Sequence, residues 1–323
     1  MSKPPAPCAA RYFIVWNVAP CIVIGRNQIA EAEIDLAEAA SRNVAITRRS
    51  SGGGAVYQDP NTIQYSIIQP YLPGLNGDAM QAARRRVAGD IAEALRSFGI
   101  PAVVEGRNDI TAGGAKVSGI SQIMRGGWLN THGTLLYDTD LDILAKLLKP
   151  DTDKFISKAV QSVRRRVQNV KPLIAPKYNY LSTVDVFIAA FKAAVLAGAE
   201  AQGSPLVEYA PSPCDMINIH KIRSVQYANP SYTFQVSPPY TFRNSRRFPQ
   251  GRVEVFVEVI KGQTISCAIR GDFIGGAPVE TLEHLLRGIP FQMAEYSAVL
   301  SDDIVANALG GINKQELLNI IFA

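Results

Sequence analysis

The sequence is poor in residues that bind metals or form cross-links. Its four cysteines, at positions 8, 21, 214 and 267, form no CxxC pair, and its three histidines are scattered. This spacing argues against a structural zinc site and favours reduced thiols. No apolar run approaches the ~20 residues that a membrane span needs. The start, MSKPPAPCAARYF, lacks the apolar core of a signal peptide. We therefore expect a cytoplasmic protein without membrane contact.

The excess of one charge sign over the other is small as well. The chain of 323 residues has 33 Lys and Arg against 28 Asp and Glu, which gives a net charge of +5. This mild excess favours an acidic partner or an anionic substrate. The basic clusters at 84–86, 164–166 and 246–247 contain no interleaved aromatic residues, so we expect no nucleic-acid binding.

Hydrophobic patterning predicts a mixture of strands and helices over most of the chain. The helix over 77–99 is the clearest, and its Arg84-Arg85-Arg86 run is expected to be its solvated face. A short turn at Pro60 and Asn61 predicts a hairpin of 55–59 with 62–70. The other elements expected before the tail are strands over 11–17, 21–25, 44–49, 102–106, 108–126 and 130–138, helices over 30–43, 140–148 and 182–202, and a helical or looped segment over 153–170.

The C-terminal part of the sequence differs in composition from the rest. Residues 229–250 are dense in Pro, Ser and Asn and predict a linker between a domain over 1–228 and a small α+β domain over 251–323. The small domain is expected to begin with a β-hairpin that turns at Lys261-Gly262-Gln263. Helices over 279–287, 301–309 and 313–322 follow.

The stretch RRSSGGGAVYQD, at 48–59, is the first with a pattern that suits chemistry. Gly52, Gly53 and Gly54 leave backbone N–H groups open to a ligand anion. Either Arg48 or Arg49 could add a planar charged fork for carboxylate or phosphate. The stretch matches neither the Walker loop nor a GxGxxG turn that opens a helix. A glycine-rich surface turn with solvated arginines is the alternative.

Three further stretches carry polar groups beside predicted strands. In EGRNDI, Asn108 and Asp109 could hold magnesium against phosphate oxygens, or simply close a hairpin as an Asx turn. In AKVSGISQ, strand alternation predicts that Lys116 and Ser118 share one face, where the lysine points either into a pocket or to solvent. In NTHGTLL, His132 is either a general base or a structural histidine.

These motifs, in this order, resemble the lipoate–protein ligase A family. The matching stretches are VIGRNQ (23–28), RRSSGGGAVY (48–57), RNDI (107–110), KVSGISQ (116–122), HGTLL (132–136) and SVRRRVQN (162–169). The resemblance implies an α+β fold: a catalytic domain over 1–228 with mixed and antiparallel sheets and flanking helices, related to biotin ligases, and an accessory domain over 251–323. It also implies a two-step reaction, in which lipoate and MgATP give lipoyl-AMP and a lysine of a carrier then takes the acyl group.

The resemblance also assigns roles to individual residues. Lys116 would bridge the lipoyl carbonyl and the phosphate, and Asp109, helped by Asn108, would position Mg²⁺. Arg49 and the backbone of Gly53, Gly54 and Ala55 would hold the adenylate and the lipoyl end. The remaining nucleotide-binding positions would be Ser51, Val56, Tyr57, Ser118, Gly119, His132 and Gly133. Lipoate would be bound by Trp16, Val23, Gly25, Arg26 and Lys116.

The expected partners are lipoyl-domain proteins, either 2-oxoacid dehydrogenase E2 subunits or carriers of the glycine cleavage H type. The ligase itself is expected to be a monomer. Two features depart from the family's pattern. The chain begins about where the family's second strand should be, and Gln58 stands where the family commonly has histidine. An octanoyl or lipoyl transferase of the same superfamily, or a non-catalytic homologue that binds lipoyl domains, are the alternative functions.

Overall fold

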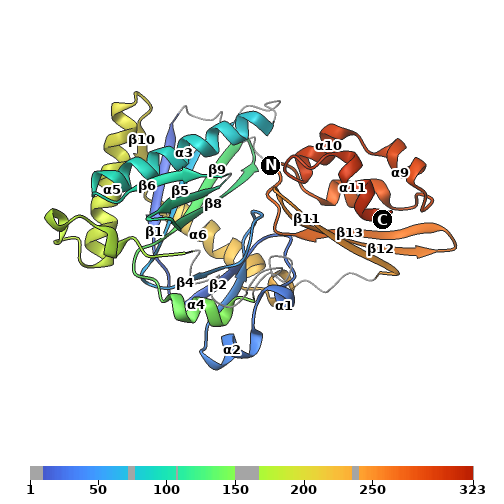
Figure 1. The fold of residues 1–323 in the computed structure, drawn as a ribbon, viewed down its shortest axis with the longest axis horizontal. Coiled ribbons are helices and arrows are strands. Elements are labelled where there is room, and N and C mark those ends of the chain that lie inside the picture. Colours follow the sequence, from blue (N-terminus) through green and yellow to red (C-terminus); the bar gives the residue numbers. More distant parts are fainter. Residues whose placement is uncertain (1–9, 72–76, 107, 150–166, 235–239, 323) are drawn as a thin grey trace. The chain divides into compact units, whose positions relative to one another are not determined.

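The computed structural model describes residues 10–71, 77–106, 108–149, 167–234 and 240–322. The chain divides into two compact units, each built from several segments (Figure 1). The first unit comprises Met1–Ile22, Asp35–Ala45 and Val56–Lys221, and the second comprises Val23–Ile34, Ile46–Ala55 and Ile222–Ala323.

A seven-stranded sheet forms the centre of the first unit. Its strand order is β10-β1-β5-β9-β8-β7-β6. All neighbouring strands pair antiparallel except β1 and β10, which pair parallel. The strands are β1 (Arg11–Trp16), β5 (Thr62–Pro70), β6 (Ala102–Glu105), β7 (Asp109–Ala112), β8 (Ala115–Arg125), β9 (Trp128–Leu136) and β10 (Leu206–Glu208).

One face of this sheet packs against two long helices, α3 (Gly77–Ser97) and α5 (Val184–Ala201). Ile63, Tyr65 and Ile67 alternate along β5 toward a buried hydrophobic cluster that includes side chains of both helices. In α5, the predicted spacing of Phe187, Phe191 and Val195 is confirmed, because all three are buried there. Residues of β5 between these apolar ones must lie on the other face.

A further three-stranded sheet has the order β3-β2-β4, formed by β3 (Ala45–Arg48), β2 (Cys21–Ile24) and β4 (Val56–Gln58). The predicted hairpin of 55–59 with 62–70 is therefore wrong, because β4 pairs with β2 whereas β5 pairs with β1 and β9. The helix expected over 30–43 is two short helices, α1 (Ala30–Glu33) and α2 (Leu36–Ser41). Asp35 separates them, and its carboxylate caps α2 by accepting from the Glu38 N–H. Helix α4 (Leu141–Leu147) forms close to its predicted range.

The second unit contains its own antiparallel sheet, of order β11-β12-β13. These strands are β11 (Phe242–Phe248), β12 (Gly251–Ile260) and β13 (Gln263–Gly271). One face of the sheet, with Val253, Val255 and Val257, packs into a hydrophobic cluster with the helices that follow. Those helices are α8 (Glu280–Leu286), α9 (Met293–Val299), α10 (Asp302–Ala308) and α11 (Lys314–Ile321).

Two elements lie within the range 229–250 that the sequence assigns to a linker. They are α7 (Pro230–Thr233) and β11, which pairs with β12 along its whole length. Pro, Ser and Asn are common in linkers, but the arginine-rich stretch FRNSRRF, with a Phe at each end, also suits an edge strand. Helix α6 (Pro213–Ile222), which the sequence pattern does not indicate, precedes them and buries none of its residues.

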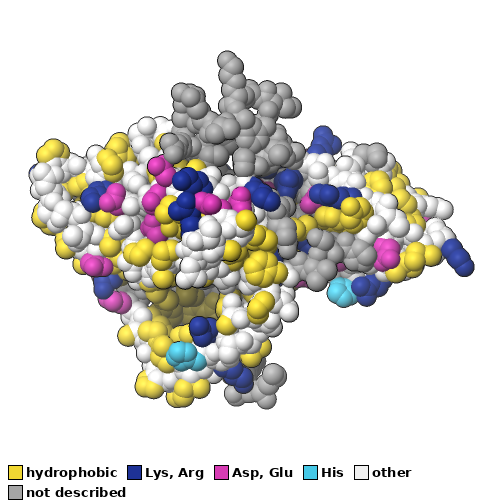
Figure 2. All heavy atoms as spheres, turned by 90° about the horizontal axis from the view of Figure 1, so that it is seen from below, with side chains coloured by type: hydrophobic (Ala, Val, Ile, Leu, Met, Phe, Trp, Pro, Cys, Tyr) yellow, Lys and Arg dark blue, Asp and Glu magenta, His cyan; other side chains and the backbone are white. Residues whose placement is uncertain are grey.

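The predicted α+β class is confirmed, with helices packed against the seven-stranded sheet and against the β11-β12-β13 sheet. Arg84 corrects the prediction of a solvated arginine run: only 4% of its surface is exposed, whereas Arg85 and Arg86 are exposed. The segment over 153–166 lies outside the described residues. None of the described helices combines the length and the apolar character needed to cross a bilayer. On the face drawn in Figure 2, basic and acidic side chains are interspersed.

Candidate active site

Lys116 and Asp109 form a charged pair on neighbouring strands of the seven-stranded sheet. The Lys116 Nζ lies 2.6 Å from the Asp109 Oδ1, and each side chain is about a third exposed, at 35% and 36%. Gly119, which pairs with Asp109 across the sheet, leaves the space that the lysine occupies. A Cβ atom on Gly119 would lie only 3.0 Å from the Lys116 Nζ. The pair is thus accessible and held over a position without a side chain.

A β-bulge decides which side chains join this pair. Ile110 and Thr111 of β7 are adjacent, yet they pair with Ser118 and Lys116 of β8, so Val117 is an extra residue. The predicted shared face of Lys116 and Ser118 is therefore wrong. Ser118 is 1% exposed, and its hydroxyl lies 2.8 Å from that of Tyr65 in the hydrophobic cluster.

Gly133 also serves the packed face of the sheet. The ring of Tyr65 passes directly over it, and a Cβ atom there would meet the Tyr65 hydroxyl at 2.4 Å. Only glycine leaves room for that crossing. Ser118 and Gly133 thus lie on the packed face of the sheet, opposite the face that carries the Lys116–Asp109 pair.

The groups near Asp109 fit a magnesium ion better than a transition metal. Asp109 and Asn108 offer hard oxygen ligands. The Asn108 Nδ2 donates to the Ile120 carbonyl at 3.3 Å, so the amide nitrogen is used within the sheet and the amide oxygen is the atom that could bind a cation. No group of three or more His, Cys, Asp and Glu residues in the described part of the chain is arranged to hold a metal. Mg²⁺ commonly needs only one or two protein carboxylates, because waters and substrate phosphates supply the other ligands.

The glycine loop lies in the second unit, and its three glycines meet different demands. A Cβ atom on Gly52 would lie 2.3 Å from the Phe273 carbonyl oxygen. Gly53 adopts φ +97° and its N–H donates to that same carbonyl at 3.3 Å. Gly54 is exposed, and a Cβ atom there would meet nothing within 4 Å. The N–H of Gly53 is therefore engaged within the protein, and the open backbone is that of Gly54 and Ala55.

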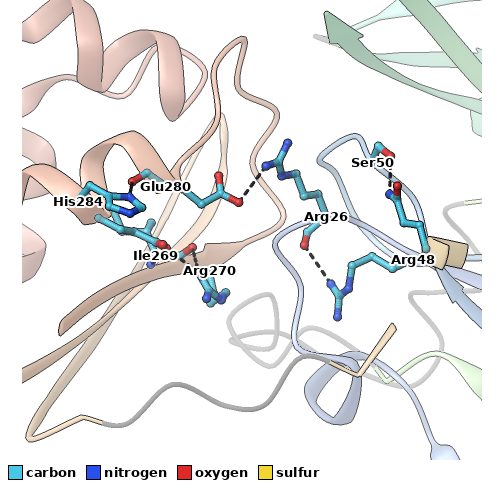
Figure 3. Close-up of polar contacts among 9 residues, drawn as sticks. Arg26, Arg48, Ser50, Ile269, Arg270, Glu280 and His284 are labelled. Atoms are coloured by element: carbon cyan, nitrogen blue, oxygen red, sulfur yellow. Dashed lines mark hydrogen bonds and ion pairs between the residues drawn. The ribbon is translucent and has the colours of Figure 1, made fainter. Parts of the chain in front are cut away.

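The two arginines before the loop have separate roles, which the sequence left undecided. Arg48 is fully buried at 0% exposure, and its guanidinium donates to several backbone carbonyls, that of Arg26 among them (Figure 3). Those acceptors belong to Gly25, Arg26, Gln28, Tyr232 and Thr233. Arg48 thus joins two segments of the second unit, 25–28 and 232–233, by hydrogen bonds. Because it is fully buried, it is not placed to bind a ligand.

Arg49 instead faces the glycine loop. Its Nη2 donates to the carbonyls of Gly52 and Gly54, both at 2.8 Å, and its Nη1 donates to the Val23 carbonyl at 3.1 Å. Burial lowers the Arg49 pKa to about 10, so the guanidinium stays charged at neutral pH. A cation that shapes this loop from beside its exposed glycine is well placed to attract an anion.

Gly25 links two of the predicted motifs within the second unit. A Cβ atom on Gly25 would lie 1.9 Å from the Gly53 carbonyl oxygen, so the VIGRNQ stretch and the glycine loop touch. We expect Gly25→Ala to lower the free energy of unfolding by about 2 kcal/mol, since backbone must shift to relieve the clash. Gly54→Ala is the matched control, because it meets no atom. Equal urea midpoints for the two variants would contradict this packing.

The other predicted site residues are distributed over both units. In the first unit, His132 is half-buried on β9, Trp16 is 38% exposed on β1, and Tyr57 is buried on β4 beside Val56. Burial raises the Tyr57 pKa to about 12. In the second unit, Ser51 is buried and Val23 half-buried, and the Arg26 Nη2 lies 2.8 Å from the Glu280 Oε1 (Figure 3).

A model of the lipoyl protein ligase A/B catalytic domain matches residues 5–195, and one of the bacterial lipoate protein ligase C-terminus matches residues 237–321. The chain belongs to the lipoate–protein ligase family. The lipoate-protein ligase LplJ of Bacillus subtilis is 30% identical, with 97% of this chain and 91% of that relative covered. A probable lipoate-protein ligase A of Mycoplasma genitalium is 32% identical, with 95% and 88% covered.

Solved structures place the chain in the same fold as other lipoate–protein ligases. LipL1 of Plasmodium falciparum in complex with lipoate has a TM-score of 0.70 at 21% identity, with 90% of this chain and 81% of that chain covered. A bi-partite ligase from Thermoplasma acidophilum, studied with its E2 lipoyl domain, scores 0.60 at 23% identity, with 72% and 87% covered. A lipoate-protein ligase A bound with ATP scores 0.56 at 24% identity, with 70% and 87% covered.

Sequence reasoning missed one residue of this ligase that the structure brings to the same face as the pair. Gln64 lies within the buried run TIQYSI of β5 and pairs with Thr134 of β9, which in turn pairs with Gly119. Polar residues at 62, 64 and 66, alternating with apolar ones, were the available signal. Such alternation indicates a strand with one polar face.

Proposed function

We propose that this chain is an ATP-dependent ligase that activates lipoate as lipoyl-AMP and transfers the lipoyl group to a lysine of a lipoyl-domain carrier. Membership of the lipoate–protein ligase family over nearly the whole chain supports this activity. The observation that carries the catalytic assignment is the Lys116–Asp109 pair, which lies accessible on the sheet face opposite the hydrophobic cluster.

In the first step, a carboxylate oxygen of lipoate attacks the α-phosphorus of ATP, and pyrophosphate leaves. In the second step, the carrier's lysine amine attacks the acyl carbonyl carbon, and AMP leaves as the amide forms. Both steps concentrate negative charge on oxygens next to the α-phosphorus or the acyl carbon. The Lys116 ammonium, fixed over Gly119, is positioned to stabilise that charge without having to reorganise.

Asp109 and Asn108 would hold Mg²⁺, which when bound neutralises charge on phosphate oxygens. Until a substrate is present, the Asp109 carboxylate compensates the charge of Lys116 and keeps the ammonium in place. Arg49 and the open backbone of Gly54 and Ala55 would supply an anion-binding edge for the adenylate. The carriers proposed are E2 subunits of 2-oxoacid dehydrogenases or H-type proteins, whose acidic surfaces the chain's net charge of +5 would attract.

An octanoyl or lipoyl transferase would need an activated cysteine nucleophile, and the described cysteines do not favour one. Burial raises the pKa of Cys21 to about 11 and that of Cys267 to about 12, so both thiols stay protonated at neutral pH. Cys214 is exposed on α6, outside the sheet that carries Lys116. The ligase therefore remains the function that the residues support best.

The test is incubation of the chain with ATP, Mg²⁺, lipoate and an apo lipoyl domain, read by intact mass and by pyrophosphate release. A carrier mass gain of one lipoyl group, dependent on ATP and matched by pyrophosphate, is expected. Acylation from an octanoylated carrier without ATP would instead establish the transferase. Binding to the carrier without any modification would establish the non-catalytic homologue.

A further inference from the structure

A row of paired residues crosses the face of the seven-stranded sheet that lies opposite the hydrophobic cluster. Trp16, Gln64, Thr134, Gly119 and Asp109 are consecutive partners on β1, β5, β9, β8 and β7. Directly paired residues of antiparallel strands point to the same face. The row therefore leads from the Lys116–Asp109 pair, across two positions with no side chain or a small one, to Gln64 and the exposed indole of Trp16.

Gln64 has an unusual hydrogen-bonding state in this row. It is 3% exposed, and its Nε2 donates to the Thr62 carbonyl at 2.9 Å. Its Oε1 is buried and accepts no hydrogen bond from any described residue. The amide cannot simply be turned around, because its oxygen would then face the Thr62 carbonyl oxygen. Buried acceptors are rarely left without a partner, so this oxygen is free to accept from a group other than the described residues.

The polarity of the row fits one of the substrates of the proposed ligase. Charged groups lie at the β7 and β8 end, and an aromatic side chain lies at the β1 end. Lipoate has the same gradient, with a carboxylate at one end and an apolar ring at the other. Gln64 lies two strands from Gly119, which is roughly 10 Å. With its carboxylate near Lys116, an extended eight-carbon acid would bring its far end close to Gln64.

We propose that Gln64 sets the acid selectivity of this site and favours lipoate over octanoate. In a strained disulfide ring, each sulfur has an electron-poor region along the extension of the S–S bond, and the Gln64 carbonyl oxygen would contact it there. Octanoate offers only C–H groups, so the buried oxygen would stay without a partner when that acid is bound. A site whose polar group is left unpaired rejects the analogue that lacks the matching group. This inference rests on the proposed ligase activity.

The test compares lipoate and octanoate with the wild-type chain and with Gln64→Leu, which keeps the size and removes the carbonyl. Calorimetry gives the Kd of each acid, and competition of the two acids for one apo carrier gives the ratio of their kcat/KM values. In Gln64→Leu we expect the preference for lipoate to fall by roughly tenfold, mainly through better use of octanoate. The KM for ATP is expected to stay unchanged.

Gln122→Leu is the matched control. Gln122 is also buried with an unpartnered Oε1, but it pairs with Thr131 on the packed face of the sheet. It is expected to leave the selectivity ratio unchanged. An unaltered ratio in Gln64→Leu would overturn the proposal, as would a raised KM for ATP with an unaltered ratio, which would place the nucleotide there. If the wild-type chain binds neither acid, the proposed function itself fails, and the proposal falls with it.

Discussion

Replacing Lys116 with alanine is expected to abolish adenylate formation while leaving the protein folded. The ammonium is the cation held over Gly119, and its removal leaves charge on the α-phosphate and acyl oxygens without a fixed donor. Loss of one preorganised donor typically costs about 10²–10³ in rate, and a full charge at the reacting centre costs at least as much. The rate of pyrophosphate release and the rate at which lipoylated carrier appears in the mass spectrum should both fall by a factor of about 10³.

The stability of this variant is expected to change little. The Lys116–Asp109 pair is about a third exposed, and exposed ion pairs contribute roughly 0–1 kcal/mol. Lys192→Ala provides the matched control, because Lys192 is also 35% exposed and its Nζ lies 2.8 Å from the Glu208 Oε1 in the same unit. It should keep full activity. Activity of Lys116→Ala within threefold of the wild type would contradict the catalytic assignment.

Local sequence patterns singled out candidate residues but not their arrangement. They pointed to Lys116 and Asp109 as separate candidates, and the structure pairs the two side chains at 2.6 Å. They also indicated that Ser118 lies beside Lys116, which the bulge at Val117 prevents. A bulge depends on how β8 pairs with β7. The stretch AKVSGISQ alone does not determine that pairing.

Strand partners were hard to predict for the same reason. The turn residues Pro60 and Asn61 suggested a hairpin, and the Thr62 N–H does donate to the Asp59 carbonyl at 2.9 Å to form a tight turn. The strands on either side nevertheless join different sheets. A turn fixes the direction of the chain over four residues, whereas the partner of a strand is chosen by the packing of the whole unit.

The adjacent arginines show how far burial can separate two residues of one type. Next to three glycines, Arg48 and Arg49 are equivalent in the sequence, and either could have been the anion-binding cation. The structure gives Arg48 five carbonyl acceptors and no exposed surface, and gives Arg49 the edge of the glycine loop. Successive side chains of a strand point to opposite sides, and only the surrounding segments decide which side is buried.

Arg48→Met is accordingly expected to destabilise the second unit without removing any group from the candidate site. The change deletes the donors that Arg48 supplies to the carbonyls of Arg26, Gln28 and Thr233, whereas the Gly25 carbonyl still accepts from the Gln28 N–H. An unsatisfied buried acceptor costs about 1–3 kcal/mol, so a loss of about 4 kcal/mol in the free energy of unfolding is expected. Arg48→Lys keeps three donors in place of five, so its free energy of unfolding should lie between those of the wild type and Arg48→Met.

Hydrogen exchange is the suitable measurement, because both tryptophans, Trp16 and Trp128, lie in the first unit and would not report on this change. Peptides that cover 23–34 and 230–234 should lose protection in Arg48→Met, since Arg48 joins these segments. Arg287→Met is the control, because Arg287 is exposed in the same unit. Equal protection of both segments in the two variants would show that the loops are held by other contacts. A selective loss would establish that Arg48 acts by holding these two segments together.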